Sequence, residues 1–342
     1  MGYREKINIY VPQEVGQQLE SDARLFEILK KDKRSINRNR FLSMLLCGYY
    51  DDYCHEVQNA HDMVLSIVEQ SLVGCTNAEE ITSQIIERVI LPPVPSRKGK
   101  QPLHWSLKPT RETDRIIMAI MAQPTEGFLS QYICRMLISY CRKSISQRER
   151  IIFKENYDKV MTACSRQRPI AFTTTWNESR VHNVIPYCLA TGTEELFNYL
   201  LCEEVNPETG ISEARTFRLN RICNVSFWND ARRMSAEVRQ HCDRMKTLAP
   251  QYAINDDDEI CVRLTDEGIR LFGRIYYGRP LYDRIDDRKD GHYMYFSCSS
   301  AQVLHYFRRF GHSSVEIIYP PKLREDMIRF HQEALLVYQT NS

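Results

Sequence analysis

The chain has 342 residues, of which 43% are hydrophobic and 26% charged, as is usual for a globular protein. Its 46 lysines and arginines nearly balance its 44 aspartates and glutamates, so any contact with a polyanion must come from local basic patches. No apolar run reaches the ~18 residues of a membrane helix, and the start, MGYREKINIYV, lacks a signal-peptide core. The twelve cysteines form no C-x-x-C pair. We therefore expect a cytoplasmic protein with reduced thiols and no membrane partner.

Basic residues gather in three stretches of the chain. Residues 30–40 (KKDKRSINRNR) hold six basic side chains and one acid, and residues 97–115 and 142–168 are also enriched. Such a run is usually a solvated surface. Each of these stretches lies beside a predicted junction between elements, however, and this favours a polyanionic partner.

The first elements form a strand followed by two helices. Residues 5–11 (EKINIYV) alternate apolar and polar side chains, which predicts a strand with one apolar and one polar face. Apolar residues at helical spacing predict a helix over 13–30, and Asn37 is a suitable N-cap for a second, apolar-faced helix. One strand with two helices cannot close a core alone, whereas two copies can pair their strands.

This order of elements resembles the ribbon-helix-helix unit of the Arc and MetJ repressors, whose paired strands enter the major groove of DNA. The resemblance implies that the polar strand face, formed by Lys6, Asn8 and Tyr10, contacts base edges. It also implies that the backbone N–H groups near Asn37 and Arg38, at the start of the second helix, bind a phosphate. The alternative is a dimerisation module that does not bind DNA.

The same pattern recurs later in the chain. Residues 102–109 (PLHWSLKP) alternate like a strand, a helix capped by Thr110 follows, and a second helix is expected over 128–142. We therefore predict two ribbon-helix-helix-like units, near 4–54 and 102–145, which pair either within one chain or between chains. An unrelated helical hairpin is the alternative.

Residues 168–226 contain short strands separated by turn signals, which predicts a small barrel. The helix before them and the successive strands follow in the order of a WYL domain. Residues 198–200 (NYL) stand where that family has Trp-Tyr-Leu, and residues 215–222 (RTFRLNRI) resemble its Arg-x-Phe-Arg-Leu-Asp-Arg-Ile run. Asn198 and Asn220 depart from the Trp and the Asp of the family.

WYL domains resemble Sm-fold barrels and are regarded as sensors of ligands or nucleic acids. The resemblance implies a polar, basic pocket, lined in this chain by Arg180, His182, Tyr199, Arg218 and Arg221. Guanidinium groups bind phosphates through paired hydrogen bonds, and a tyrosine adds a stacking surface. The alternative is that the arginines tie strands together through carboxylates and that His182 is structural.

Residues 258–342 are predicted to form a βαββαβ domain with a final helix, an order that is ferredoxin-like. This domain resembles the C-terminal extension of WYL proteins, which implies an oligomerisation and regulatory element. We therefore predict an α+β protein in three parts: a ribbon-helix-helix-like helical N-terminal region (1–150), an Sm-like β-barrel WYL domain (151–235) and the ferredoxin-like C-terminal domain (258–342).

No motif of a known catalytic site is present. The sequence lacks G-x-x-x-x-G-K-[ST], G-x-G-x-x-G and G-x-S-x-G, its nine histidines are dispersed, and no carboxylates have metal-ligand spacing. We expect a non-enzymatic protein without a metal or a cofactor.

The combination of ribbon-helix-helix-like units with a WYL domain resembles the WYL accessory proteins of type VI-D CRISPR–Cas systems, which are understood to bind single-stranded RNA and to raise effector RNase activity. The resemblance implies single-stranded RNA or DNA and a CRISPR effector nuclease as partners. Two alternatives stay open: a transcription repressor with a ligand-sensing barrel, and a scaffold that binds no nucleic acid. We also expect a homodimer, formed through the ribbon strands or the C-terminal domain.

Overall fold

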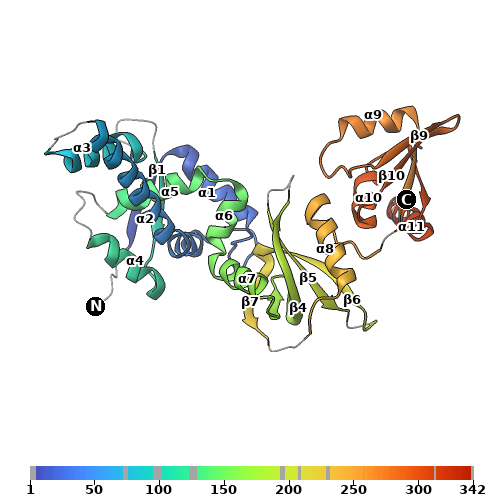
Figure 1. Cartoon of the computed structure of the whole chain (residues 1–342), viewed down its shortest axis with the longest axis horizontal. Helices are drawn as coiled ribbons and strands as arrows, with labels where there is room; N and C mark the ends of the chain where they lie inside the picture. The colour runs from blue at the N-terminus through green and yellow to red at the C-terminus, as the bar shows by residue number, and fades with distance from the viewer. Residues whose placement is uncertain are drawn as a thin grey trace. The chain divides into compact units, whose positions relative to one another are not determined.

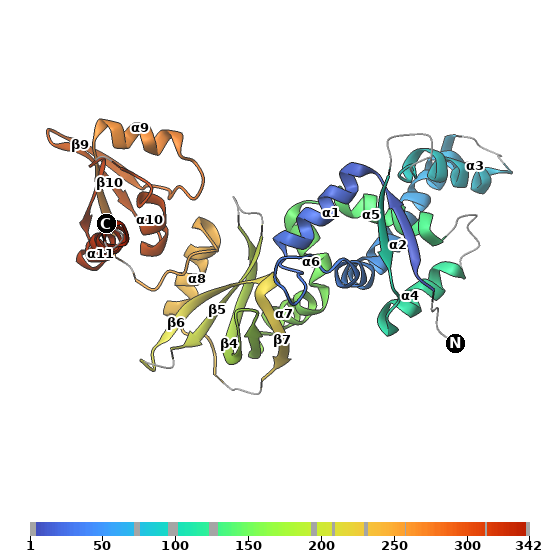
Figure 2. The ribbon, with the colours of Figure 1, turned by 180° about the vertical axis from the view of Figure 1, so that it is seen from behind.

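The structure is a computed structural model, shown from two sides in Figures 1 and 2. Helices and strands both make up large parts of it, in agreement with the α+β prediction. The chain divides into two compact units, Met1–Glu155 and Asn156–Ser342. The structure describes residues 5–71, 76–94, 102–122, 129–192, 197–206, 209–228, 232–256, 258–311 and 313–339.

The first unit contains a two-stranded ribbon formed within one chain. β1 (Ile7–Val11) pairs antiparallel with β2 (Leu103–Leu107), so that Ile9 lies opposite Trp105 on the buried face. Figure 2 shows the two strands side by side as the blue and teal arrows. The two predicted units therefore pair with each other in the same chain, and each strand obtains a ladder partner without a second copy.

Helices cover the apolar side of this ribbon. Phe41 of the first repeat packs against the second repeat, because its ring centroid lies 6.3 Å from that of Trp105 and 6.3 Å from that of Tyr140. Thr110 caps the helix after β2 as predicted, since its side chain accepts a hydrogen bond from the N–H of Thr113. The helices of this unit are α1 (Gln13–Leu25), α2 (Arg38–Ser71), α3 (Ala78–Ile85), a π-helical turn (Ile86–Ile90), α4 (Arg111–Met121), α5 (Leu129–Cys141) and α6 (Ile145–Ile152).

The basic stretch 30–40 forms an ordered turn before α2. α1 ends at Leu25 rather than at residue 30, because Glu27 adopts a positive φ of 59° and the chain turns back. Asp32 closes this turn by accepting hydrogen bonds from the N–H groups of Arg34 and Ser35, both at 2.9 Å. These backbone hydrogen bonds, that of Ser35 foremost, lower the pKa of Asp32.

The second unit begins with a five-stranded antiparallel sheet in the order β6-β5-β4-β3-β7. The predicted closed barrel is wrong, because no ladder in the described part of the chain joins the edge strands β6 and β7. Only the 3₁₀ turn Leu219–Arg221 connects these two edges, so the sheet must curl strongly. The strands are β3 (Ile170–Thr174), β4 (Asn177–Thr191), β5 (Asn198–Val205), β6 (Ser212–Arg218) and β7 (Ile222–Phe227).

A helix lies on each face of this sheet. α7 (Lys154–Arg166) contributes Val160 and Ala163 to the core on one face. α8 (Ala236–Leu248) packs against β4, β5 and β6 on the other face, as Figure 1 shows. Alternation along β5 therefore directs successive side chains toward different helices.

The last part of the chain has the predicted βαββαβ order followed by a helix. Its four strands form an antiparallel sheet in the order β11-β8-β10-β9. Phe272, Phe296 and Phe307 are buried in its core. No described helix in the chain is long and apolar enough to cross a membrane. The elements are β8 (Ile260–Leu264), α9 (Asp266–Arg274), β9 (Arg284–Arg288), β10 (Gly291–Phe296), α10 (Ser300–Phe307), β11 (Val315–Tyr319) and α11 (Pro321–Gln339).

Candidate nucleic-acid interface

The polar face of the ribbon is exposed, as the sequence predicted. Lys6, Asn8 and Tyr10 all lie at the surface, and the Tyr10 side chain is 53% exposed. His104 of the paired strand joins them: its Nε2 lies 3.0 Å from Oδ1 of Asn8, and its ring centroid lies 5.3 Å from that of Tyr10. Both strands of one chain therefore contribute to one continuous polar face.

The start of α2 is organised as predicted, with Asn37 as the cap. Its Oδ1 accepts a hydrogen bond of 3.1 Å from the N–H of Arg40. The Arg38 guanidinium lies over the Trp105 ring, 5.1 Å from its centroid, and pairs with Glu20. Phosphate binding by these N–H groups stays a prediction.

Two of the predicted pocket residues meet at a buried carboxylate. Nδ1 of His182 lies 2.8 Å from Oε1 of Glu204, and the Arg180 guanidinium lies 4.0 Å from the same oxygen. His182 is buried between Phe172 and Phe217, with ring centroids 5.4 and 4.8 Å away. This geometry fits the alternative interpretation, in which Arg180 ties strands together and His182 is structural.

The other three predicted residues lie elsewhere. Tyr199 pairs with Arg218 across β5 and β6, and the Arg218 guanidinium stacks on Phe197 at 3.3 Å from the ring centroid. Arg221 lies in the 3₁₀ turn, with its guanidinium 5.2 Å from the ring centroid of Trp176.

Arg180 and His182 contact Glu204, whereas Arg218 lies beside Tyr199. Tyr199 and Glu204 lie an odd number of residues apart on the regular strand β5, so the two groups face opposite sides of the sheet and the five predicted residues do not surround one cavity. The 3₁₀ turn after Arg218 then separates it from Arg221. Arg218 and Arg221 nevertheless share one feature: each guanidinium group lies over an aromatic ring.

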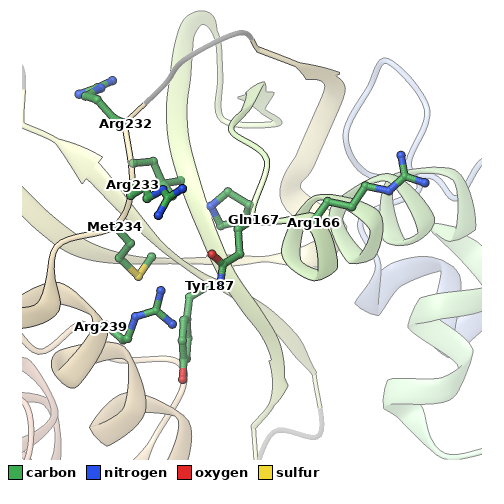
Figure 3. A pocket seen from close by; sticks show the side chains of 9 residues that line it. Arg166, Gln167, Tyr187, Arg232, Arg233, Met234 and Arg239 are labelled. Atoms are coloured by element: carbon green, nitrogen blue, oxygen red, sulfur yellow. The ribbon is translucent and has the colours of Figure 1, made fainter.

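A different cavity, which we call the arginine pocket, lies in the same unit. It has a volume of about 440 Å³, and none of its lining residues is acidic. Figure 3 shows the side chains of Arg233, Arg239 and Gln167 directed into the same space, whereas the guanidinium groups of Arg166 and Arg232 extend from its rim. The lining residues are Arg166, Gln167, Ile185, Pro186, Tyr187, Arg232, Arg233, Met234 and Arg239.

Side chains from α7, β4 and α8 form the walls of this pocket. The end of α7 supplies Arg166 and Gln167, and the first turns of α8 supply Arg239, whose guanidinium lies 5.7 Å from the ring centroid of Tyr187. The Tyr187 hydroxyl donates a hydrogen bond to Asp243, which raises the pKa of Tyr187 to about 12. Tyr187 is therefore a neutral wall with an aromatic face.

Sequence inspection missed most of this pocket. Arg166 belongs to the basic stretch 142–168, but Arg232, Arg233 and Arg239 lie beyond it. The adjacent arginines 232 and 233, followed by one on the first turn of a helix, were the available signal. Only the packing of α8 against β4 and β5 brings them opposite the end of α7.

No family model matches this chain, and no curated protein matches it. Among solved structures, one described as a CRISPR Cas-related protein aligns with a TM-score of 0.63 at 17% identity, over 98% of this chain and 95% of that one. The proteasome accessory factor B/C (PafBC) of Arthrobacter aurescens aligns with a TM-score of 0.26 at 12% identity, over 98% of this chain and 50% of that one. The first likeness shows a shared fold over almost the whole length of both chains, and the second is too weak to support an argument.

Proposed function

We propose that this protein is a non-enzymatic regulator that binds single-stranded RNA through its second unit and raises the activity of a CRISPR RNase effector. The fold that it shares with a CRISPR Cas-related protein supports a role in a CRISPR system. The WYL-like signature runs at 198–200 and 215–222 support the class of sensor. The observation that carries the binding function is the series of arginine–aromatic pairs around the five-stranded sheet.

The pair of Arg221 and Trp176 shows why these contacts suit a single strand. Trp176 is 58% exposed, so its ring offers a surface to a base, while the adjacent guanidinium offers a positive charge to a phosphate. Arg168 lies over Phe227 in the same way, at 4.5 Å from the ring centroid, and Phe227 is 39% exposed. Unstacked bases are accessible only in single strands, so stacking platforms with nearby arginines favour these over a duplex.

A salt titration tests the proposal directly. Binding of single-stranded RNA and of duplex DNA of equal length is measured at increasing salt, and the log of the RNA affinity is expected to fall linearly because phosphate contacts release counterions. Trp176→Ala is expected to weaken RNA binding about tenfold, since one stacked base contributes about 1–3 kcal/mol. Tyr276→Ala is the matched control, because Tyr276 is 72% exposed in the C-terminal domain.

The second half of the proposal needs a separate measurement. The rate of RNA cleavage by the effector is recorded with and without the protein, and an increase is expected that Trp176→Ala diminishes. RNA binding without any change in the cleavage rate would leave the binding function standing and reject the effector function.

The exposed ribbon face supports one rival function, that of a DNA-binding repressor. Lys6, Asn8 and Tyr10 are available to base edges, and the ribbon is complete within one chain. In the titration this function predicts tighter binding of duplex DNA than of RNA. A scaffold protein predicts that neither nucleic acid binds.

A further inference from the structure

We infer that the arginine pocket binds the terminal phosphate of a nucleotide, either as a free mononucleotide or as the end of a single strand. The strand-end case rests on the proposed function, whereas the mononucleotide case does not. The pocket lies apart from the residues predicted from the WYL resemblance, since neither Arg218 nor Arg221 lines it.

The size of the cavity suits a single nucleotide unit, free or at the end of a strand, rather than several consecutive nucleotides. Its volume of about 440 Å³ lies within the ~300–1,000 Å³ of pockets that enclose small molecules. Surfaces that follow a single strand are instead extended grooves that accommodate about 4–16 nucleotides. A ligand of one phosphate with its sugar and base suits a cavity of this volume.

The charges of the cavity select an anion. Within the described part of the chain, the guanidinium groups of Arg166 and Arg233 form no hydrogen bond or ion pair, and that of Arg239 lies against the Tyr187 ring instead of a carboxylate. Glu203 and Asp243 do not line the cavity, and they accept hydrogen bonds from the N–H of Ser235 and from the Tyr187 hydroxyl respectively. Guanidinium groups held around one space repel each other, and a bound anion removes that repulsion.

The strength of the positive field favours a phosphate monoester over the diester of an internal linkage. A terminal monoester carries about −1.5 to −2 charges at neutral pH, whereas each backbone diester carries one. Arg233 and Arg239 point into the cavity with Gln167 beside them, so a monoester there meets donors from two sides. The remaining walls, Ile185 and Tyr187, present apolar and aromatic surface for a sugar or a base.

Calorimetry with small probes tests the pocket in the intact chain. Adenosine 5′-monophosphate is expected to bind and inorganic phosphate to bind more weakly, whereas adenosine is expected not to bind. Oligonucleotides of about ten residues, ending in a hydroxyl, a 5′-phosphate or a 3′-phosphate, then identify the source of the phosphate. A preference of the strand for one phosphorylated end supports the strand-end case, and mononucleotide binding without such a preference supports the free nucleotide.

The variant Arg233→Gln with Arg239→Gln is expected to weaken binding of the monophosphate at least tenfold, because it removes two charge-assisted hydrogen bonds. Both side chains are exposed, so the fold should survive, and circular dichroism checks this. Arg270→Gln with Arg329→Gln is the matched control: it removes the same charge from α9 and α11. The single variant Arg233→Gln serves if the double variant is unfolded.

The result that overturns the inference is specific. If the monophosphate and the phosphorylated ends bind no better than adenosine and the hydroxyl end, or if the double variant and its control lose affinity equally, the pocket is not a phosphate site. The affinity for the hydroxyl-ended strand reports on the proposed function separately. It should depend on Trp176 whether or not the pocket inference fails.

Discussion

Arg148 on α6 binds the completely buried carboxylate of Asp22 on α1. Its Nε lies 2.7 Å from Oδ2 and its Nη2 lies 3.2 Å from Oδ1. Tyr140 donates a hydrogen bond of 2.9 Å to Oδ2, and Gln18 donates one of 2.8 Å to Oδ1. Both oxygens of Asp22 therefore have two donors each, and this one carboxylate connects α1, α5 and α6 inside the first unit.

Asp22→Ala is expected to destabilise the protein by about 3–5 kcal/mol, because it leaves the Arg148 charge buried without its partner. Glu20→Ala is the control on the same helix. It removes a partly exposed ion pair with Arg38, which contributes about 0–1 kcal/mol. Urea denaturation monitored by circular dichroism measures both, and equal losses would show that the Asp22 network is not what holds the helices together.

Gly48→Ala is expected to destabilise the first unit strongly. A Cβ at Gly48 would lie 1.9 Å from the carbonyl oxygen of Ile151, so α2 and α6 would have to separate. Gly273→Ala is the matched control in α9, where a Cβ meets nothing within 4 Å. There the better helix propensity of alanine should stabilise by up to about 1 kcal/mol. A melting temperature of Gly48→Ala equal to that of the wild type would contradict the close packing.

If the ribbon contacts DNA, Lys6→Ala with Asn8→Ala should abolish specific duplex binding and spare single-strand binding by the second unit. Because β2 completes the ribbon, His104→Ala should weaken duplex binding as well. Electrophoretic mobility shifts with both nucleic acids measure this. Loss of both activities together, in a folded protein, would argue against separate sites.

Arg218→Glu with Arg221→Glu is expected to weaken single-strand binding by at least tenfold, since it reverses two positive charges, one of which lies beside the exposed Trp176 ring. The two groups contact different rings, Phe197 and Trp176, so the single variants should have additive effects. Fluorescence anisotropy with labelled RNA measures the affinities. A folded double variant with wild-type affinity removes these residues from the interface.

A homodimer is expected in solution, and the structure favours the C-terminal domain over the ribbon as its interface. β1 obtains its partner from β2 of the same chain, so the ribbon no longer requires a second copy. The C-terminal sheet, by contrast, ends in the edge strands β9 and β11, and α11 exposes Leu335, which is 56% accessible. Light scattering should give the mass of two chains, and deletion of residues 258–342 should give the mass of one. A full-length monomer rejects the prediction.

Local sequence patterns determined most of the elements correctly. Alternation in residues 5–11 and 102–109 predicted both ribbon strands and the exposed side of Lys6, Asn8 and Tyr10, because period two is a property of the extended backbone itself. The caps at Asn37 and Thr110 were likewise predicted from residues adjacent in sequence. The βαββαβ order of the C-terminal part followed from the same kinds of signal.

Only the tertiary structure decided how strands and side chains combine. A 3₁₀ turn divides the WYL-like run 215–222 between two strands, so Arg218 and Arg221 reach different aromatic rings and the sheet stays open. The arginine pocket could not be predicted either, because Arg166 and Arg233 meet only when α7 and α8 pack on the curled sheet. The sequence by itself thus determined each element and its exposed face, since these depend on near neighbours. The convergence of distant charges depends on strand curvature and helix packing, which no local pattern specifies.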